Sequence, residues 1–329
     1  MPSSLSAAVL SVSKLDEALA AYRDILGLTP SAQFTMKGDA FARHWAVPPS
    51  TSARAVLLSN GESKVGRLLL MEFDAPNRAR ICPPDGRTYR GFWNLNFYVD
   101  DIRALVPKLR MRGVNLWRDI TEYHTAGSWL ETVAEGPDGI AIAIFQLLGE
   151  SGTTVAEVRA ASTSRTPTGF SEVGTTSHCV HDFDKARGFY EKVLGMRALF
   201  DQVVDSPELN RLNGRPADGK TRWGFMAGDN MFGKIMVSNP MNYGVPERVH
   251  LAAPPNIGYV AQSFEVDDLD AAYTACREVS AEIFSPPLIL NYPGLGPRRT
   301  MVVRNPGSGG LTELVQKVAA PIELRLAAE

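Results

Sequence analysis

A polar strand face and one carboxylate in an apolar strand are the residues best suited to chemistry in this sequence. Because side chains alternate along a strand, Asn94, Asn96 and Tyr98 share one face of a predicted strand and point three hydrogen-bonding groups the same way. Glu72 lies in another predicted strand, Arg67–Phe73. Burial raises the pKa of a carboxyl group, so we expect Glu72 to be the catalytic acid or base of an enolisation, elimination or isomerisation. The polar face would then donate to a developing oxyanion.

The competing interpretation of Glu72 is structural, with its carboxylate paired to Arg67, Arg43 or a backbone group. A second open alternative is a site in which His44 or His124 joins Glu72. Four of the five tryptophans lie in the same half of the chain, and rings that line a concave, partly polar site suit an aromatic or flat ligand. Any one such ring, taken alone, is more often core packing. The predicted substrate-binding residues are Asn94, Asn96, Tyr98, His44, Trp45, His124 and Trp129.

An internal repeat organises the chain. The segment Leu15–Leu28 returns as Phe183–Met196, and Val99–Ile102 returns as Val266–Leu269 at nearly the same spacing. Each copy contains the order strand, helix, strand, strand, strand twice. We therefore expect an α+β protein made of four βαβββ modules, at residues 1–75, 90–149, 170–240 and 256–320. The stretch 150–169 is rich in Ser, Thr, Ala and Gly and predicts a linker, and 321–329 predicts a tail.

Hydrophobic periodicity predicts where the elements of these modules begin and end. In the first module, a helix with apolar residues at i, i+3, i+4 and i+7 begins at Leu15 and stops near Gly27, with Asp16 in its first turn. The predicted strands are Phe41–Ala46, Arg54–Leu58, Arg67–Phe73, Asn94–Val99, Ile140–Leu147, Ala261–Val266 and Leu311–Gln316. His44 then falls in a middle strand.

Three short motifs, repeated in the same order, resemble those of a known superfamily. The helices end in Tyr-x-x-x-Leu-Gly at 22–27 and 190–195, strands end in Val-Asp-Asp at 99–101 and 266–268, and a Gly-Pro-Asp-Gly turn at 136–139 precedes a terminal strand. This arrangement resembles the vicinal-oxygen-chelate (VOC) superfamily, which includes glyoxalase I, bleomycin-resistance proteins and extradiol dioxygenases. The resemblance covers nearly the whole chain. It implies two tandem glyoxalase-like domains, 1–149 and 170–320, each with curved mixed sheets around a cavity.

The resemblance also implies where a divalent metal would be held, on the first and last strands of each module. The residues at those places are Ala7, Glu72, Asn94 and Ala143 in the first half and Thr175, Ser238, Ala261 and Glu313 in the second. One carboxylate per half cannot supply the three or four ligands of a catalytic metal, so we expect no metal and no cofactor. In the second cavity, a hydroxyl-rich set provides the candidate residues, which are Thr175, Ser177, Ser238, Ser263 and Glu313.

Composition narrows the partners of the protein. Its 34 Lys+Arg against 36 Asp+Glu give a formal net charge of -2, so no basic field supports nucleic-acid or membrane-surface binding. No apolar run approaches the ~20 residues of a membrane span, and residues 1–10 lack the layout of a signal peptide. Three isolated cysteines argue against a disulfide framework. We expect a cytoplasmic protein whose partner is a small organic molecule, with a homodimer left open.

These observations favour a small-molecule enzyme of the lyase or isomerase type that lacks the usual metal ligands. It would carry out acid–base chemistry on a small aromatic or carbonyl compound. Two alternatives stay open. One is a non-catalytic protein of the bleomycin-resistance type, which binds and sequesters a small molecule. The other is a metal-dependent extradiol dioxygenase or glyoxalase with a non-standard site.

Overall fold

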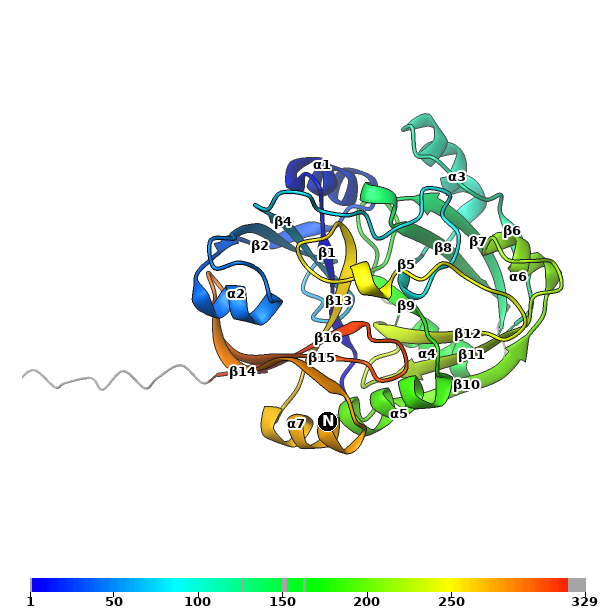
Figure 1. Cartoon of the computed structure of the whole chain (residues 1–329). Helices are drawn as coiled ribbons and strands as arrows, with labels where there is room; N and C mark the ends of the chain where they lie inside the picture. Colours follow the sequence, from blue (N-terminus) through cyan, green and yellow to red (C-terminus); the bar gives the residue numbers. More distant parts are fainter. Residues whose placement is uncertain (1, 126, 150–152, 162–163, 319–329) are drawn as a thin grey trace, which may run out of the picture.

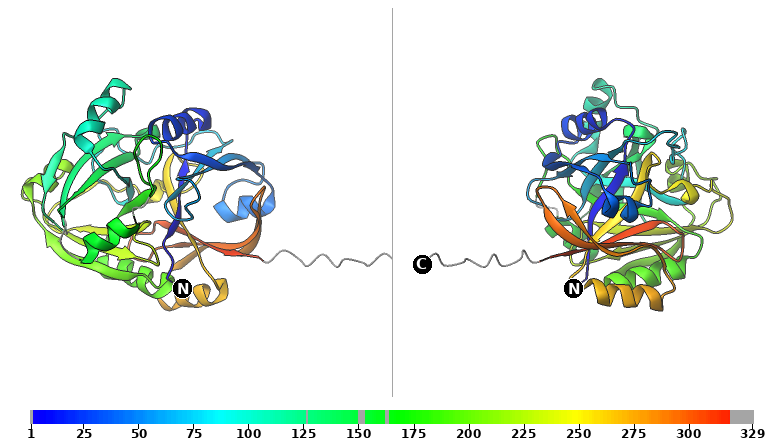
Figure 2. Two further views of the ribbon diagram at one scale, coloured as in Figure 1. Left: turned by 180° about the vertical axis from the view of Figure 1, so that it is seen from behind. Right: turned by 60° about the vertical axis from the view of Figure 1, so that its left-hand side comes forward.

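The computed structural model describes residues 2–125, 127–149, 153–161 and 164–318, whose strands form two curved eight-stranded sheets (Figures 1 and 2). Sheet one contains β1 (Leu5–Ser11), β2 (Thr29–Met36), β3 (Ala53–Ser59), β4 (Arg67–Phe73), β13 (Gly258–Glu265), β14 (Glu282–Tyr292), β15 (Gly296–Arg304) and β16 (Leu311–Lys317). Sheet two contains β5 (Gly91–Tyr98), β6 (Thr121–Tyr123), β7 (Ser128–Glu135), β8 (Ala141–Leu148), β9 (Val173–Cys179), β10 (Arg197–Val204), β11 (Thr221–Ala227) and β12 (Lys234–Pro240). The strand orders are β14-β15-β16-β13-β1-β4-β3-β2 and β10-β11-β12-β9-β5-β8-β7-β6.

The four-module α+β architecture is confirmed, but each sheet takes one module from each half of the chain. In sheet one, β1 pairs with β13 and Ala8 stands opposite Gln262; in sheet two, β5 pairs with β9 and Asn96 stands opposite Thr175. We expected each half to enclose its own cavity, and that pairing is wrong: the first module joins the fourth, and the second joins the third. The sequence pattern within one module does not reveal which other module it pairs with. The first strands of all four modules are almost entirely buried, so their apolar patterns look alike.

Helices flank both sheets. Helix α1 (Leu15–Ala20) runs on into the π-helical turn η1 (Ala21–Ile25), and the other helical elements are α2 (Asp39–Trp45), α3 (Ile102–Met111), η2 (Pro137–Gly139), α4 (Thr153–Ala161), α5 (Phe183–Leu194), α6 (Pro207–Leu212), η3 (Val249–Leu251) and α7 (Leu269–Glu278). In the part of the chain that the structure describes, none of them is long and apolar enough to cross a membrane.

The second aspartate of each Val-Asp-Asp motif begins a helix. Asp101 and Asp268 accept hydrogen bonds from the backbone N–H groups of Ala104 and Ala271, three residues further on. These bonds satisfy N–H groups that have no partner within the first turn of a helix. The motif therefore marks the step from the first strand of a module to its helix.

Residues 41–45 form most of helix α2, where we predicted a strand over 41–46. The helix buries Phe41, His44 and Trp45, whose i, i+3, i+4 spacing is that of one helix face. Ala46 ends it in a left-handed conformation with φ 53°. Helix α2 contacts β14 and β15 of sheet one (Figure 1). Its His44 is fully buried.

A ring of four backbone hydrogen bonds joins the two sheets at equivalent points of the repeat. Leu5 N–H donates to Gly233 O at 3.0 Å and Gly66 N–H to Leu5 O at 2.8 Å, while Val173 N–H donates to Gly66 O at 3.0 Å and Gly233 N–H to Val173 O at 3.1 Å. Gly66 and Gly233 have φ values of 61° and 70°. A Cβ atom at Gly66 would stand 2.4 Å from the Val173 oxygen, so the ring requires glycine there.

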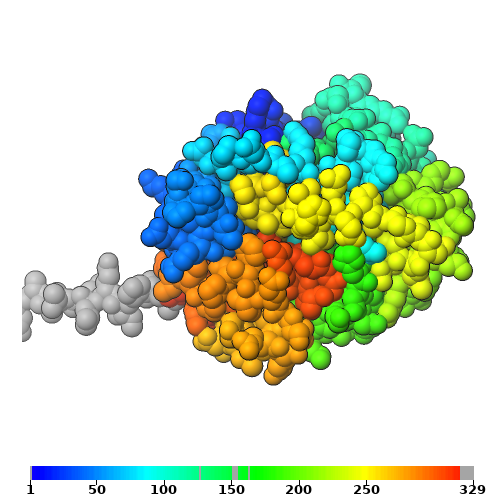
Figure 3. Space-filling model, in the orientation of Figure 1, coloured from blue at the N-terminus to red at the C-terminus, as the bar shows by residue number. Residues whose placement is uncertain are grey.

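Two long connections run side by side over the outside of the molecule. Residues 74–90 join the first two modules and 241–257 join the last two. Ile81 N–H donates to Ile257 O at 2.8 Å, and Arg90 N–H donates to Pro246 O at 2.9 Å. Figure 3 shows the yellow 241–257 segment beside cyan residues of the earlier connection on the front face. The second half of the repeat is thus tied to the first outside the sheets as well.

The segment predicted as a linker, 150–169, contains helix α4. Its Val155 and Val158 are buried, and Val158 belongs to a small apolar cluster with Tyr98 and Phe232 of sheet two. We predicted a linker because the segment has few large apolar residues. Two valines at i and i+3 lie on the same face of a helix, however, and are enough to pack one helical turn against the sheet. The predicted tail, 321–329, lies outside the described residues.

Candidate functional site

The concave face of sheet two encloses a cavity of about 310 Å³ between the second and third modules. Aromatic rings form much of its wall, with Tyr98 5.3 Å from Phe232, 6.0 Å from Phe145 and 6.1 Å from Trp129 between ring centroids. The polar residues that line it are Asn94, Asn96, Tyr98, Tyr123, Thr125, Glu131, Thr175, Ser177, Asn213, Trp223 and Lys234. An apolar pocket with a few convergent polar groups is typical of a small-molecule site.

The polar face of β5 points into this cavity. Asn94, Asn96 and Tyr98 all line it, as their alternation predicts, together with Thr175 and Ser177 of β9. Asn94 Oδ1 accepts a hydrogen bond from the Ser177 backbone N–H at 3.0 Å, which fixes that amide across the two strands. The sequence placed Thr175 and Ser177 in a separate second cavity, but the pairing of β5 with β9 brings all five residues into one.

Three buried polar atoms of the cavity wall have no hydrogen-bond partner among the described residues. They are Asn96 Oδ1, Ser177 Oγ and Trp223 Nε1. Leaving a buried donor or acceptor unpaired costs about 1–3 kcal/mol, and such atoms are rare in folded proteins. Two donors and one acceptor that converge on a cavity are suited to the polar groups of a ligand.

Glu131 is a titratable group in the cavity wall that the sequence analysis did not identify. It lies on β7 two residues from Trp129, is 4% exposed, and accepts a hydrogen bond from Tyr123 Oη at 2.8 Å. Among the described residues no cation stands within ion-pair distance of it. Burial raises the pKa of Glu131 to about 8, although the Tyr123 hydrogen bond and the charge of Arg215 oppose the rise. The alternation that places Trp129 in the cavity predicts the same for Glu131.

Lys234 was also missed. It begins β12, is 3% exposed, and its Nζ lies 5.5 Å and 5.6 Å from the ring centres of Tyr98 and Phe232. The Nζ donates to the Met231 carbonyl, and burial lowers the pKa of Lys234 to about 7. A lysine at the start of a strand is usually a solvated residue, so composition gave no signal for it.

Glu72 does not face a cavity. Its neighbours Arg67 and Leu69 line the concave side of sheet one, so the alternation of β4 turns Glu72 to the opposite side, where helix α1 packs. Glu72 Oε2 accepts hydrogen bonds from the Leu15 backbone N–H at 3.0 Å and from Arg54 Nη2 at 2.6 Å. The structure therefore gives Glu72 the kind of partners that the structural interpretation expects, with Arg54 in place of Arg67 or Arg43, and does not place it in the wall of either sheet's cavity.

We expect Glu72→Gln to leave ligand binding and turnover within about twofold of wild type, because the carboxylate only supports the start of α1. The free energy of unfolding should fall by about 0.5–1 kcal/mol, the size of a helix-terminus charge and an exposed ion pair. Urea titration measures the second effect and an activity or binding assay the first. A loss of activity above tenfold in a folded variant would contradict this placement.

Sheet one has its own, smaller cavity of about 200 Å³, lined by Ser263 and Glu313. His44 Nε2 lies 2.8 Å from Glu313 Oε1, and Tyr292 Oη donates to the same oxygen at 2.7 Å. Burial would raise the pKa of Glu313, but the hydrogen bond and charge of His44, together with the hydrogen bonds of Ser263 and Tyr292, hold the pKa below its usual range. Helix α2 thus packs beside this concave face, where its His44 holds the Glu313 carboxylate in place.

The remaining predicted residues are dispersed. Trp129 lines the cavity of sheet two, whereas Trp45 is buried against His44 at a ring distance of 4.6 Å. His124 is exposed beside Ser128, 3.0 Å away. Ser238 is buried on β12 two residues beyond Met236, a lining residue of the cavity. The histidines and Trp45 therefore do not join the polar face of β5.

The positions where the resemblance implies a metal do not carry a fitting set of ligands. Sheet two has Asn94, Ala143, Thr175 and Ser238 there, and sheet one has Ala7, Glu72, Ala261 and Glu313. Of the two carboxylates, Glu72 points away and Glu313 is bound by His44. Over the described residues, no three His, Cys, Asp or Glu side chains gather closely enough to hold an ion. These donors do not fit a catalytic divalent metal.

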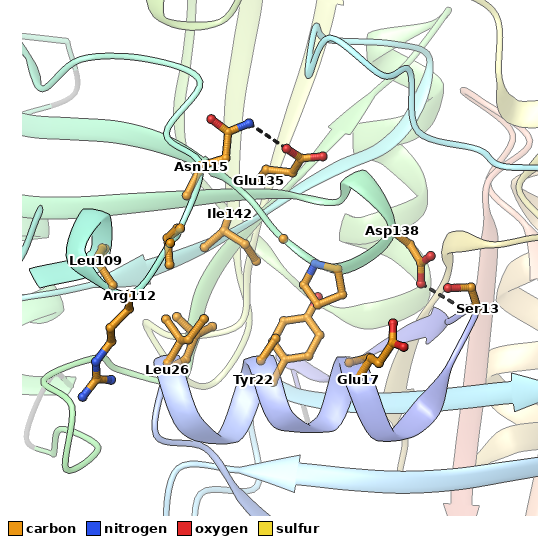
Figure 4. Close-up of a pocket in the computed structure, with 18 of the residues that line it drawn as sticks. Ser13, Glu17, Tyr22, Leu26, Leu109, Arg112, Asn115, Glu135, Asp138 and Ile142 are labelled. Atoms are coloured by element: carbon orange, nitrogen blue, oxygen red, sulfur yellow. Dashed lines mark hydrogen bonds between the residues drawn. The ribbon is translucent and has the colours of Figure 1, made fainter.

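A larger groove of about 480 Å³ lies on the outside, between α1 and the second module (Figure 4). Its charged side chains pair with their neighbours. Asp138 accepts from the Ser13 backbone N–H at 2.8 Å, and Glu135 accepts from Asn115 Nδ2 at 2.8 Å, as the dashed lines show. Polar groups already satisfied in this way leave little for a ligand to pair with, so the enclosed cavity of sheet two is the better candidate.

Comparison with known proteins identifies the family to which this fold belongs. A model of the Glyoxalase/Bleomycin resistance protein/Dioxygenase superfamily matches residues 4–144 and 173–287, so the chain belongs to this superfamily. The two matched segments correspond to the two halves of the repeat.

Solved structures share the fold at low sequence identity. A mutant of glyoxalase I from Zea mays superposes with a TM-score of 0.63 at 17% identity, covering 95% of this chain and 92% of that one. A putative dioxygenase from Bacillus subtilis gives a TM-score of 0.59 at 12% identity, covering 97% and 86%. No curated protein sequence gives a significant match. The likeness therefore shows the fold, and the chemistry has to be argued from the cavity.

Proposed function

We propose that the protein is a metal-independent enzyme that carries out acid–base chemistry on a small aromatic or carbonyl compound in the cavity of sheet two. One observation carries the proposal: Glu131 is a buried carboxyl group in the cavity wall whose only hydrogen bond among the described residues comes from Tyr123. Its pKa of about 8 lets the group gain and lose a proton near neutral pH. Structural carboxylates usually have a cation or several hydrogen-bond donors beside them, as Glu313 has His44 and Tyr292.

The chemistry follows from what surrounds Glu131. The ionised carboxylate removes a proton from the carbon beside a carbonyl group, and the resulting acid returns it to a neighbouring atom, which gives an isomerisation or an elimination. Trp223 Nε1–H and Ser177 Oγ–H are unpartnered donors that can stabilise the developing oxyanion. The rings of Tyr98, Phe145 and Trp129 hold a flat substrate.

Proton exchange tests this proposal directly. The purified protein is incubated in D2O with a panel of aryl alkyl ketones, arylacetaldehydes and α-hydroxy carbonyl compounds, and NMR follows the loss of the proton on the carbon next to the carbonyl. Because Glu131 must be ionised to act as a base, the rate should rise with pH through about 8. The cationic and phenolic groups nearest the carboxylate are Arg215 and Tyr123.

Two outcomes would favour the other candidates. Stoichiometric binding with no exchange and no product at any pH would indicate a sequestering protein. Turnover that disappears on treatment with a chelator and returns with one equivalent of a divalent metal would indicate a metal-dependent enzyme. Elemental analysis of the purified protein distinguishes the second case before any substrate is known.

A further inference from the structure

Lys234 occupies an unusual position for a lysine. It lies on β12 opposite Thr175 in the register with β9, inside the same cavity as Glu131. Its Nζ contacts the Met231 carbonyl and the rings of Tyr98 and Phe232. Within the described ranges, no carboxylate lies within 4.0 Å of it. A buried ammonium group is usually paired with an anion, because desolvation of a lone charge is costly.

This environment favours the neutral amine. Burial lowers the pKa of Lys234 to about 7, so about half of the amine is unprotonated at neutral pH. An exposed lysine with a pKa of about 10.4 is unprotonated in fewer than about one molecule in a thousand. The other titratable groups on the cavity wall are Tyr98, Tyr123 and Glu131, and burial raises the pKa of Tyr98 to about 12, so Tyr98 is uncharged. A neutral amine is a nucleophile toward carbonyl carbon.

We infer that Lys234 is a nucleophilic amine that forms an imine with an aromatic aldehyde or ketone bound in the cavity of sheet two. This inference rests on the proposed function and names its substrate class. It requires a carbonyl group that reaches Nζ and a flat ring that packs against Tyr98 and Phe145. A cavity of about 310 Å³ accommodates a substituted benzaldehyde or an aryl ketone.

The step balances without an oxidant or a reductant. The Nζ lone pair forms a bond to the carbonyl carbon, and the π electron pair of the C=O bond moves to oxygen, which takes a proton from protonated Glu131 or from water. Nitrogen then loses a proton to the Glu131 carboxylate. Protonation of the new hydroxyl group expels water and leaves the imine. When the bound compound is an aryl ketone with a hydrogen on the carbon next to the carbonyl, the protonated imine withdraws electrons from that carbon, so its proton becomes easier for Glu131 to remove; a benzaldehyde has no such hydrogen and stops at the imine.

Reductive trapping tests the inference. The full-length protein is treated at pH 7 with 4-hydroxybenzaldehyde and cyanoborohydride, which converts an imine to a stable secondary amine. Intact mass and peptide mapping then count and locate the adducts. We expect one adduct per chain on Lys234, formed on the order of 10²–10³-fold faster than on an exposed lysine because of the larger neutral fraction. The rate at Lys234 should level off above pH 7, whereas labelling of exposed lysines keeps rising toward pH 10.

Matched variants separate the site from general reactivity. Lys234→Met removes the amine but keeps a side chain of similar length, and it should abolish the fast adduct. Lys185→Met, at an exposed position on α5, should leave it unchanged. Mapping of the wild-type protein gives the answer even if Lys234→Met fails to fold. Labelling that follows exposure alone, with no preference for Lys234, would overturn the inference.

The inference and the proposed function can fail separately. Proton exchange that requires Glu131, together with an unlabelled Lys234, would leave the acid–base function and remove the imine. Rapid labelling of Lys234 with no proton exchange would leave a carbonyl-binding amine and remove the enzymatic proposal. Glu131→Gln should slow trapping but not redirect it to another lysine, because the nucleophile itself is unchanged.

Discussion

Replacing Glu131 with glutamine should lower turnover by about 10²–10⁴-fold, the usual contribution of a general acid or base. The amide keeps the shape of the side chain and can still pair with Tyr123, but it cannot exchange a proton. Ligand affinity should therefore change little. The measurement is kcat and the dissociation constant for the best compound of the carbonyl panel, taken at pH values on both sides of 8.

Glu135→Gln is the matched control, because Glu135 lies on the same strand, is exposed, and pairs with Asn115 outside the cavity. It should leave turnover unchanged. Stability gives a second readout of Glu131. Because its folded pKa is raised from 4.5 to about 8, its contribution to stability is full below about pH 4.5 and is lost as the pH rises through 8. Glu131→Gln should remove that part of the pH dependence. A variant that keeps full activity would end the acid–base proposal.

Replacing His44 with alanine should cost about 3–5 kcal/mol of unfolding free energy, because it leaves the Glu313 carboxylate buried without its partner. Tyr292 and Ser263 still donate hydrogen bonds, but two neutral hydroxyl groups do not replace the imidazole. Chemical denaturation at pH 7 measures the loss. His181→Ala provides the control, since His181 is half exposed and its ion pair with Glu247 lies at the surface; it should change stability by less than about 0.5 kcal/mol.

The pH dependence gives a second test of this pair. The folded pKa of Glu313 is lowered, so its stabilising effect is present above the unfolded value of about 4.5 and is lost as the pH falls through the folded value. In His44→Ala the carboxyl group can instead be buried in its protonated form. The deficit of the variant should therefore shrink as the pH is lowered. A folded variant with wild-type stability but no activity would contradict this structural role and would indicate that the functional site lies in sheet one.

Local patterns predicted the modules and several of their strands. The strands expected at Arg67–Phe73 and Leu311–Gln316 match β4 and β16 almost residue for residue, and the Val-Asp-Asp motif marks helix starts. Period-two alternation also predicted that Asn94 and Asn96 share a face that lines a cavity. These features depend on neighbours a few residues away, which the sequence displays directly.

The same reasoning failed where elements distant in the sequence determine which side of a strand points into a cavity. Glu72 was placed by counting along a family pattern, but the packing of α1 on β4 determines which side of the strand is concave. We predicted a strand at residues 41–46, but residues 41–45 form most of a helix that packs against β14 and β15 and buries His44. Local propensity does not contain that contact.

By itself, the sequence determined the family, the duplicated four-module plan and the polar face of β5. All three follow from short motifs and from the alternation of polar and apolar residues along the strands. The tertiary structure alone decided that the second module closes its cavity with the third. That pairing places Glu131 and Lys234, distant in the chain and both buried, in one cavity wall with the polar face of β5. Burial there moves the pKa values of both groups toward neutrality, and burial is a property of the assembled sheets rather than of any segment.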